Sequence, residues 1–312
     1  MRFFRAVVCA ALLAIVLATG CGQGSREEQG TEATETSSPV SESQARQETT
    51  PENETAQAPA PGDEIADGEA TEAPFTAAPE ISGGSEGAAD SIQEVRFGKH
   101  EVYERAVIGF GSRGAPASQV PSWSLSSPTG EGYARITFPN LDGASETEGV
   151  LGGSILDNFY VVRAPGGGVF VDIFATGAFQ YRVVELSAPG RLVVDYRPAS
   201  VSLDFPIPAQ AERTVLFQPR AGEAIASPLR VSGYSRNFEG SNIIVLSDPG
   251  GNVLFRGTAL SNDWAETWGY FETLLEFAPF EGEAILRVGS RSPRDGSFEG
   301  VEIPVSYAGG QG

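Results

Sequence analysis

A long segment near the start of this chain is too poor in apolar side chains to form a core. Residues 22–94 carry 17 acidic residues against Arg26 and Arg46, and Phe75 is the only aromatic residue between positions 22 and 91. Such a composition cannot bury enough apolar surface to offset the entropy lost when a backbone is ordered. We therefore expect residues 21–91 to form a disordered acidic tether rich in Pro, Thr and Glu.

The first 20 residues have the layout of a secretory signal peptide. Arg2 and Arg5 precede an apolar run over residues 6–18, which is shorter than the roughly 20 residues that cross a bilayer. The string that follows, Leu17-Ala18-Thr19-Gly20-Cys21, resembles a bacterial lipobox, in which the cysteine is acylated and becomes the first residue of the mature chain. A membrane-spanning segment and a freely secreted protein with an unmodified cysteine are the alternatives.

The cysteine content favours lipidation. Cys9 would be removed with the signal, so Cys21 would be the only thiol left and no disulfide could form within the mature chain. Acylation uses up that thiol, and two or three acyl chains hold a protein stably on a bilayer. We predict a signal peptide over residues 1–20, lipidation of Cys21, and attachment through it to lipid on the outer face of the bacterial cell membrane.

The formal charge of −20 at pH 7 comes mostly from the predicted tether, and the remaining residues are mildly acidic. A protein that binds nucleic acid needs a basic face that neutralises phosphates, and this chain has none. Nucleic acid is therefore excluded as a partner.

Residues 92–200 contain short apolar runs broken by Gly, Pro, Asn and Asp, with no sustained helical periodicity. This pattern predicts an all-β sandwich. Between the last two runs, Ser187-Ala188-Pro189-Gly190-Arg191 predicts the turn of a hairpin, in which Pro fixes one φ and Gly supplies a positive φ. The runs are 95–97, 106–110, 133–138, 159–162, 169–174, 181–186 and 192–196.

Two parts of this domain resemble the AMIN-like β domains of bacterial envelope proteins. In residues 95–110 a strand is followed by a Gly, a His, an aromatic residue, an Arg and a second strand. Residues 182–196 form a closing hairpin that ends in a strand with an Asp. The resemblance implies a β domain associated with envelope targeting and with peptidoglycan binding.

The polar residues of these strings are the first candidates for a site. His100 is the only histidine in the chain, and one imidazole without a cysteine partner makes a poor metal site, so we predict no metal. We expect His100 and Arg105 to hydrogen-bond a loop or to pair with an acid such as Asp195, and we keep both as candidate binding residues. Asp172 interrupts the run 169–174 on the opposite pleat face, and we expect it to face solvent or an arginine.

Residues 213–307 contain seven short runs with turns between them, which is the pattern of an immunoglobulin-like sandwich. The connection before them contains Pro206 and Pro208, whose stiffness favours a fixed orientation between the domains. In the fifth run alternate residues, Phe271, Thr273, Leu275 and Phe277, are predicted to face the core. The runs are 215–217, 229–234, 242–246, 253–258, 269–277, 284–288 and 301–305.

Five strings of this second domain, in order along the chain, resemble the immunoglobulin-like domain of bacterial spore-germination and other envelope proteins. The resemblance implies a sandwich that occurs beside other envelope modules and carries no catalytic residues. The strings are at residues 219–222, 227–233, 237–240, 268–271 and 294–297.

The three tryptophans are candidates for stacking on sugar rings. Trp268 belongs to one of the family-like strings, so we expect it in the core. Trp264, in a loop with Ser261, Asn262 and Asp263, is the better candidate for exposure, and Trp123 is a similar candidate in the first domain.

Catalytic motifs are absent from the sequence. The only histidine follows no nucleophile motif, no Gly-x-Ser-x-Gly elbow is present, and the Gly-rich strings open no helix that would bind a phosphate. We therefore predict no enzyme and no cofactor, but a membrane-anchored envelope lipoprotein that binds peptidoglycan, another wall polymer or an envelope protein. The alternatives are a wall-glycan hydrolase with paired carboxylates and a purely structural subunit of an envelope complex.

Overall fold

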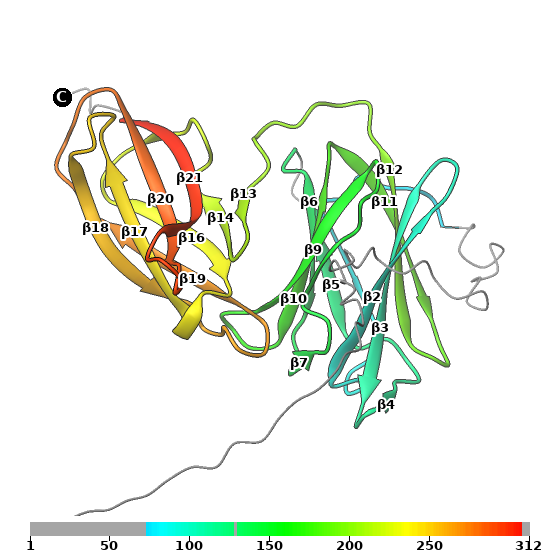
Figure 1. Ribbon diagram of the computed structural model, residues 1–312. Coiled ribbons are helices and arrows are strands. Elements are labelled where there is room, and N and C mark those ends of the chain that lie inside the picture. Colours follow the sequence, from blue (N-terminus) through cyan, green and yellow to red (C-terminus); the bar gives the residue numbers. More distant parts are fainter. Residues whose placement is uncertain (1–72, 128–129, 308–312) are drawn as a thin grey trace, which may run out of the picture. The chain divides into compact units, whose positions relative to one another are not determined.

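The computed structural model describes residues 73–127 and 130–307 (Figure 1). The regular elements of these residues are all strands, apart from one 3-10 turn, η1 Phe238–Gly240. The strands build two β-sandwiches, so the predicted all-β class is confirmed. No helix in the described ranges is long and apolar enough to cross a membrane.

The first sandwich consists of two sheets that face each other across an apolar core. One sheet has the order β11-β12-β3-β2-β7 with β4 at the side of β3, and the other contains β1-β5-β6-β10-β9 with β8 beside β9. All seven predicted runs lie within its strands. The strands are β1 Glu80–Gly83, β2 Ser91–Lys99, β3 Glu104–Ser112, β4 Ala115–Pro116, β5 Trp123–Ser126, β6 Tyr133–Phe138, β7 Gly143–Ala144, β8 Glu148–Val150, β9 Leu156–Arg163, β10 Val169–Ala175, β11 Phe179–Leu186 and β12 Arg191–Pro198.

The first sandwich begins earlier than the predicted boundary at residue 92. β1 pairs with β5, Ile81 packs against the core, and the Phe75 ring lies under the guanidinium groups of Arg182 and Arg197. The prediction of a tether as far as residue 91 is therefore wrong for residues 73–91. These few apolar side chains are enough to order the segment, because β1 forms backbone hydrogen bonds with β5, which is itself paired with β6.

The predicted hairpin between β11 and β12 is present, but its turn works differently. Ala188, and not Gly190, has the positive φ, of 52°. Glycine is required at position 190 for another reason, since a Cβ there would overlap the backbone of Gln119. The Gly190 N–H also donates to the carbonyl of Ala117 at 2.7 Å, which ties the turn to the loop after β4.

The second sandwich has the seven predicted strands and two further short ones, β13 and β15. One layer contains β19-β16-β14-β13 and the other has the order β15-β21-β20-β17-β18. Phe271 and Leu275 of β19 face the core, as predicted, although the strand ends at Leu275. The strands are β13 Ala209–Ala211, β14 Thr214–Gln218, β15 Ala224–Ile225, β16 Leu229–Ser235, β17 Ser241–Ser247, β18 Val253–Leu260, β19 Trp268–Leu275, β20 Glu283–Arg291 and β21 Phe298–Tyr307.

A short parallel pairing joins one layer of each sandwich into a single ten-stranded sheet. Trp268 and Gly269 of β19 lie opposite Val162 and Arg163 of β9. The stiff connection predicted from Pro206 and Pro208 is thus only part of the link, because backbone hydrogen bonding also couples the two domains.

Candidate functional site

An aromatic cluster fills the joint between the two sandwiches. The indole of Trp268 is fully buried, with its ring centroid 4.6 Å from that of Tyr160 and 5.8 Å from that of Tyr234. Phe174 and Phe217 belong to the same cluster, with their ring centroids 6.2 Å apart. Trp268 is therefore buried as predicted, but in the joint and not in the core of the second sandwich.

A buried ion pair lies beside this cluster. Both carboxylate oxygens of Asp172 accept hydrogen bonds from Arg135, each at 2.8 Å, and Asp172 is completely buried. The Arg135 guanidinium lies 4.0 Å from the centroid of Phe170 and 5.2 Å from that of Phe217. Asp172 was expected to face solvent or an arginine. The arginine partner is confirmed, whereas exposure to solvent is wrong, because the second sandwich covers the outer face of β10.

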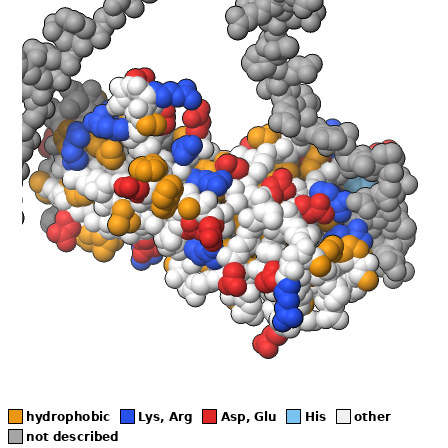
Figure 2. Space-filling view, turned by 60° about the horizontal axis from the view of Figure 1, so that its bottom comes forward, with side chains coloured by type: hydrophobic (Ala, Val, Ile, Leu, Met, Phe, Trp, Pro, Cys, Tyr) orange, Lys and Arg blue, Asp and Glu red, His pale blue; other side chains and the backbone are white. Residues whose placement is uncertain are grey.

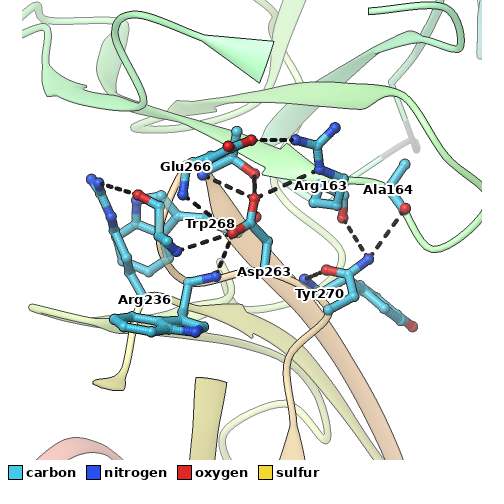
Figure 3. Close-up of polar contacts among 11 residues, drawn as sticks. Arg163, Ala164, Arg236, Asp263, Glu266, Trp268 and Tyr270 are labelled. Atoms are coloured by element: carbon cyan, nitrogen blue, oxygen red, sulfur yellow. Dashed lines mark hydrogen bonds and ion pairs between the residues drawn. The ribbon is translucent and has the colours of Figure 1, made fainter. Parts of the chain in front are cut away.

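The loop before β19 fastens the second sandwich to the end of β9 (Figure 3). The Asp263 carboxylate accepts the backbone N–H groups of residues 264–267 and the Thr267 hydroxyl. It also lies 3.6 Å from Nε of Arg163. Burial alone would raise the pKa of Asp263, but these hydrogen bonds lower it, which keeps the carboxylate charged.

The same loop makes direct contact with the backbone of the first sandwich. The Asn262 amide donates to the carbonyls of Arg163 and Ala164, each at 3.2 Å, and its oxygen accepts the Tyr270 N–H (Figure 3). Glycine is needed at position 269, because a Cβ there would overlap the carbonyl oxygen of Asp263. The loop therefore packs flat on β19.

Side chains complete the joint on the side of β8. The indole N–H of Trp268 donates to Glu148 at 3.1 Å, and Nη1 of Arg236 donates to the Thr147 hydroxyl at 2.9 Å. A paired sheet, an aromatic cluster and these polar contacts act together. We conclude that the two sandwiches are held together in one compact unit.

A groove of about 760 Å³ opens at this joint. Arg220 spans it, since Nη2 donates to Glu131 of the first sandwich at 2.7 Å and Nη1 donates to the Pro206 carbonyl at 3.3 Å. The lining contains three arginines and three glutamates, so it has no net formal charge. Both sandwiches and their connection contribute to it, chiefly through Glu131, Tyr133, Arg135, Phe205, Pro206, Phe217, Arg220, Glu223, Arg230, Ser232, Tyr270 and Glu272.

The carboxylates of the groove already have hydrogen-bond donors. Glu131 accepts from Arg220, Glu223 accepts the Arg220 backbone N–H at 2.7 Å, and Glu272 accepts the Tyr270 hydroxyl at 2.7 Å. These contacts hold the walls in place. Within residues 73–127 and 130–307, no group of three or more His, Cys, Asp or Glu could hold a metal ion.

Trp264 lies on the surface of the second sandwich, next to an exposed phenylalanine. Its side chain is 39% exposed, and its ring meets that of Phe238 edge to face with centroids 5.2 Å apart. Phe238 is 69% exposed, and Leu260, which ends β18, is also exposed. We call Phe238, Leu260 and Trp264 the aromatic tip. Figure 2 shows that hydrophobic side chains reach the face it draws in small groups among charged side chains.

The candidates of the first domain lie on the outer side of the β11-β12-β3-β2 sheet. Arg105 donates to both oxygens of Asp195, at 2.6 and 3.0 Å, and Arg182 donates to the same carboxylate at 2.7 Å. The pairing of Arg105 with Asp195 is thus confirmed. His100 stacks on Tyr103 with ring centroids 4.2 Å apart. A binding role for His100 and Arg105 stays a prediction.

Two other candidates are placed differently. Trp123 is buried in β5 and its indole N–H donates to Glu185 at 2.8 Å, so its ring faces are packed in the core and offer no stacking surface. Cys21 lies outside the described residues.

The groove was not predicted from the sequence, although two apolar runs indicate that the first sandwich is covered on its outer face. The runs 159–162 and 169–174 are almost continuously apolar, which is typical of strands buried on both faces, whereas a strand with one solvated face alternates. The outer faces of β9 and β10 therefore required a cover. Nothing in the spacing of Glu131, Phe205 and Tyr270 predicts that they meet.

Comparison with known families supports the prediction that the second sandwich is immunoglobulin-like. Residues 214–297 match the model of the immunoglobulin-like domain of bacterial spore germination, which indicates a non-catalytic, envelope-associated domain there. No curated protein and no solved structure matches the chain. The AMIN-like identity of the first sandwich stays a prediction from its residues.

Proposed function

We propose that this protein is a non-enzymatic envelope lipoprotein, anchored to the outer face of the bacterial cell membrane through acylated Cys21, whose two β domains bind a cell-wall polymer. The observation that carries the proposal is the groove at the joint, because both sandwiches build it and the joint holds its walls at a fixed spacing. The lipobox-like string and the envelope-associated family match support the setting.

A preorganised groove suits a weakly charged polymer. Walls that are fixed before binding save the entropy of ordering them around a ligand. The lining has arginines and glutamates in equal number among aromatic rings, so binding does not depend on attracting one sign of charge. A volume of about 760 Å³ is within the roughly 300–1,000 Å³ typical of ligand sites.

Cosedimentation with peptidoglycan tests this function. The full-length protein, solubilised in a mild detergent, is mixed with purified sacculi and pelleted at low and at physiological salt. We expect retention at both, because a lining with no net formal charge gives little salt dependence. Tyr270→Ala, in the groove, should reduce retention, whereas Tyr307→Ala, which removes a tyrosine packed on Phe280 outside the groove, should not. A protein that stays in the supernatant at both salts would contradict the proposal.

An envelope protein as the partner is the second candidate, and the aromatic tip favours it. Phe238 and Trp264 place contacting rings in solvent, and Leu260 is exposed at the end of β18. Aromatic side chains are enriched where proteins associate. A photo-reactive amino acid at position 238 tests this candidate in intact cells. One reproducible adduct that disappears with Trp264→Ala would favour a protein partner.

The alternative that the protein is a wall-glycan hydrolase can be tested directly. Sacculi incubated with the protein would release soluble sugar fragments if paired carboxylates cleaved the glycan. We expect no release, because the groove carboxylates contact arginine, backbone and tyrosine donors that hold the walls.

A further inference from the structure

We infer that the acidic end of the predicted tether, residues 63–72, binds across an arginine-rich face of the first sandwich. This face, which we call the arginine face, is the outer side of β11, β12, β3 and β2, on the opposite side of the sheet from the core. The inference goes beyond wall binding and does not depend on it, because the arginine face belongs to the sheet of the first sandwich that is not joined to the second.

Alternation along the strands places five arginines on this face. In β12, for example, Leu192 and Val194 face the core, so the residues on either side of them point outward. Five arginines and two acids make the face basic, whereas the whole chain has a formal charge of −20. The arginines are Arg96, Arg105, Arg182, Arg191 and Arg197, and the acids are Glu94 and Asp195.

Two of these arginines, near the two ends of β12, have no ion-pair partner among the described residues. Arg191 is partly exposed, but its Nε is buried without a hydrogen bond. Arg197 is exposed, and its Nε and Nη2 donate to the neutral amide oxygen of Gln180, at 2.9 and 2.7 Å. The arginine face therefore has guanidinium groups to which further carboxylates can bind.

The chain reaches this face at a fixed point. The centroid of the Phe75 ring lies 4.7 Å from Cζ of Arg182 and 4.5 Å from Cζ of Arg197. The next residue, Thr76, exchanges two backbone hydrogen bonds with Tyr181 of β11, at 2.8 and 2.9 Å. The segment that precedes Phe75 therefore starts at the edge of the arginine face.

This preceding segment is acidic and long enough to cross the face. No Lys or Arg lies between Arg46 and Arg96. Ten extended residues span about 33 Å, whereas four strands at a spacing of about 4.8 Å are only about 14 Å across. Residues 63–72 precede the described ranges, and their acids are Asp63, Glu64, Asp67, Glu69 and Glu72.

Attachment to the chain favours this segment over an anion from outside. Exposed ion pairs are weak one by one, so a free acidic ligand needs a high concentration to occupy the face. A short linker supplies that concentration, because it keeps the attached group at about millimolar effective concentration. The arginine face is thus an anion-binding surface that the chain itself occupies, and an outside polyanion has to displace the segment.

Modification of arginines by phenylglyoxal, followed by peptide mass spectrometry, tests the inference on the full-length protein in detergent. The test variant combines Asp63→Asn, Glu64→Gln, Asp67→Asn, Glu69→Gln and Glu72→Gln. The control variant changes the net charge equally, farther along the tether, with Glu35→Gln, Glu42→Gln, Glu48→Gln, Glu52→Gln and Glu54→Gln. Neither variant changes a residue of either sandwich, so both should fold.

We expect Arg191 and Arg197 to react about fivefold faster in the test variant than in the wild-type protein, because several exposed ion pairs together favour the bound segment by about that factor. The control variant should react at the wild-type rate. Arg287 of the second sandwich, with a 46% exposed side chain, provides the reference rate. In about 1 M salt, where charges are screened beyond roughly 3 Å, the wild-type rates should rise to those of the test variant.

Three results would overturn the inference. Equal rates at Arg191 and Arg197 in the wild-type protein and the test variant would show that the segment does not cover them. Equal acceleration in the control variant would show an effect of net charge alone. Equal protection of both proteins by a purified phosphate-rich wall polymer would show that the face is open to an outside ligand.

Discussion

Replacement of Asp172 by alanine should destabilise the protein strongly, because it leaves the Arg135 guanidinium without its counter-charge among Phe170, Phe217 and Tyr133. Removal of one member of a buried ion pair costs about 3–5 kcal/mol. Arg135 keeps a 27% exposed side chain at the groove, so the lower end, about 3 kcal/mol, applies. For a folded unit of this size that loss lowers Tm by about 6–12 °C.

Thermal and urea unfolding, followed by circular dichroism, measure this effect. Glu302→Ala is the matched control, because it breaks the ion pair of Glu302 with Arg287, in which both side chains are nearly half exposed, and it should cost less than about 1 kcal/mol. The double variant Arg135→Leu with Asp172→Leu should recover most of the loss, since it buries no unpaired charge. A cost below about 1 kcal/mol for Asp172→Ala would refute the reasoning that the second sandwich buries this pair.

Three further predictions follow from the joint and the anchor. Asp263→Asn should lower the free energy of unfolding by about 1–2 kcal/mol at pH 7. Because hydrogen bonds lower the pKa of Asp263 in the folded protein, that difference should shrink as the pH falls below about 4, and a constant difference in urea titrations would contradict this. Trp268→Ala should cost about 3–5 kcal/mol in the same assay, since its fully buried indole joins both sandwiches. Cys21→Ser should abolish labelling with radioactive palmitate; labelling that persists in this variant would contradict lipidation of Cys21.

Local pattern predicted the strands well where a strand buries one alternate set of side chains, as β17 and β21 do. Phe271 and Leu275 face the core of the second sandwich as their spacing predicts. The Arg105–Asp195 pair was likewise predictable, since their positions lie opposite each other in the register of β3 and β12. Both depend on interactions within one domain.

Contacts between the domains were not predictable from local pattern. Asp172 looks solvent-facing when β10 is considered within one sandwich, and only the second sandwich makes that face buried. The tether boundary failed for a similar reason, because β1 has little apolar content and is held by the edge of β5. The groove combines residues from both domains and from their connection, so no single segment of the sequence carries its signature.

Hydrogen exchange of the full-length protein, with and without glycan fragments prepared from sacculi, tests most directly whether both sandwiches bind the wall in the groove. The account predicts slower exchange on both walls together, at residues 131–135 of the first sandwich and at residues 217–218, 230–232 and 270–272 of the second. Protection confined to residues 236–240 and 260–264, around the aromatic tip, would contradict it.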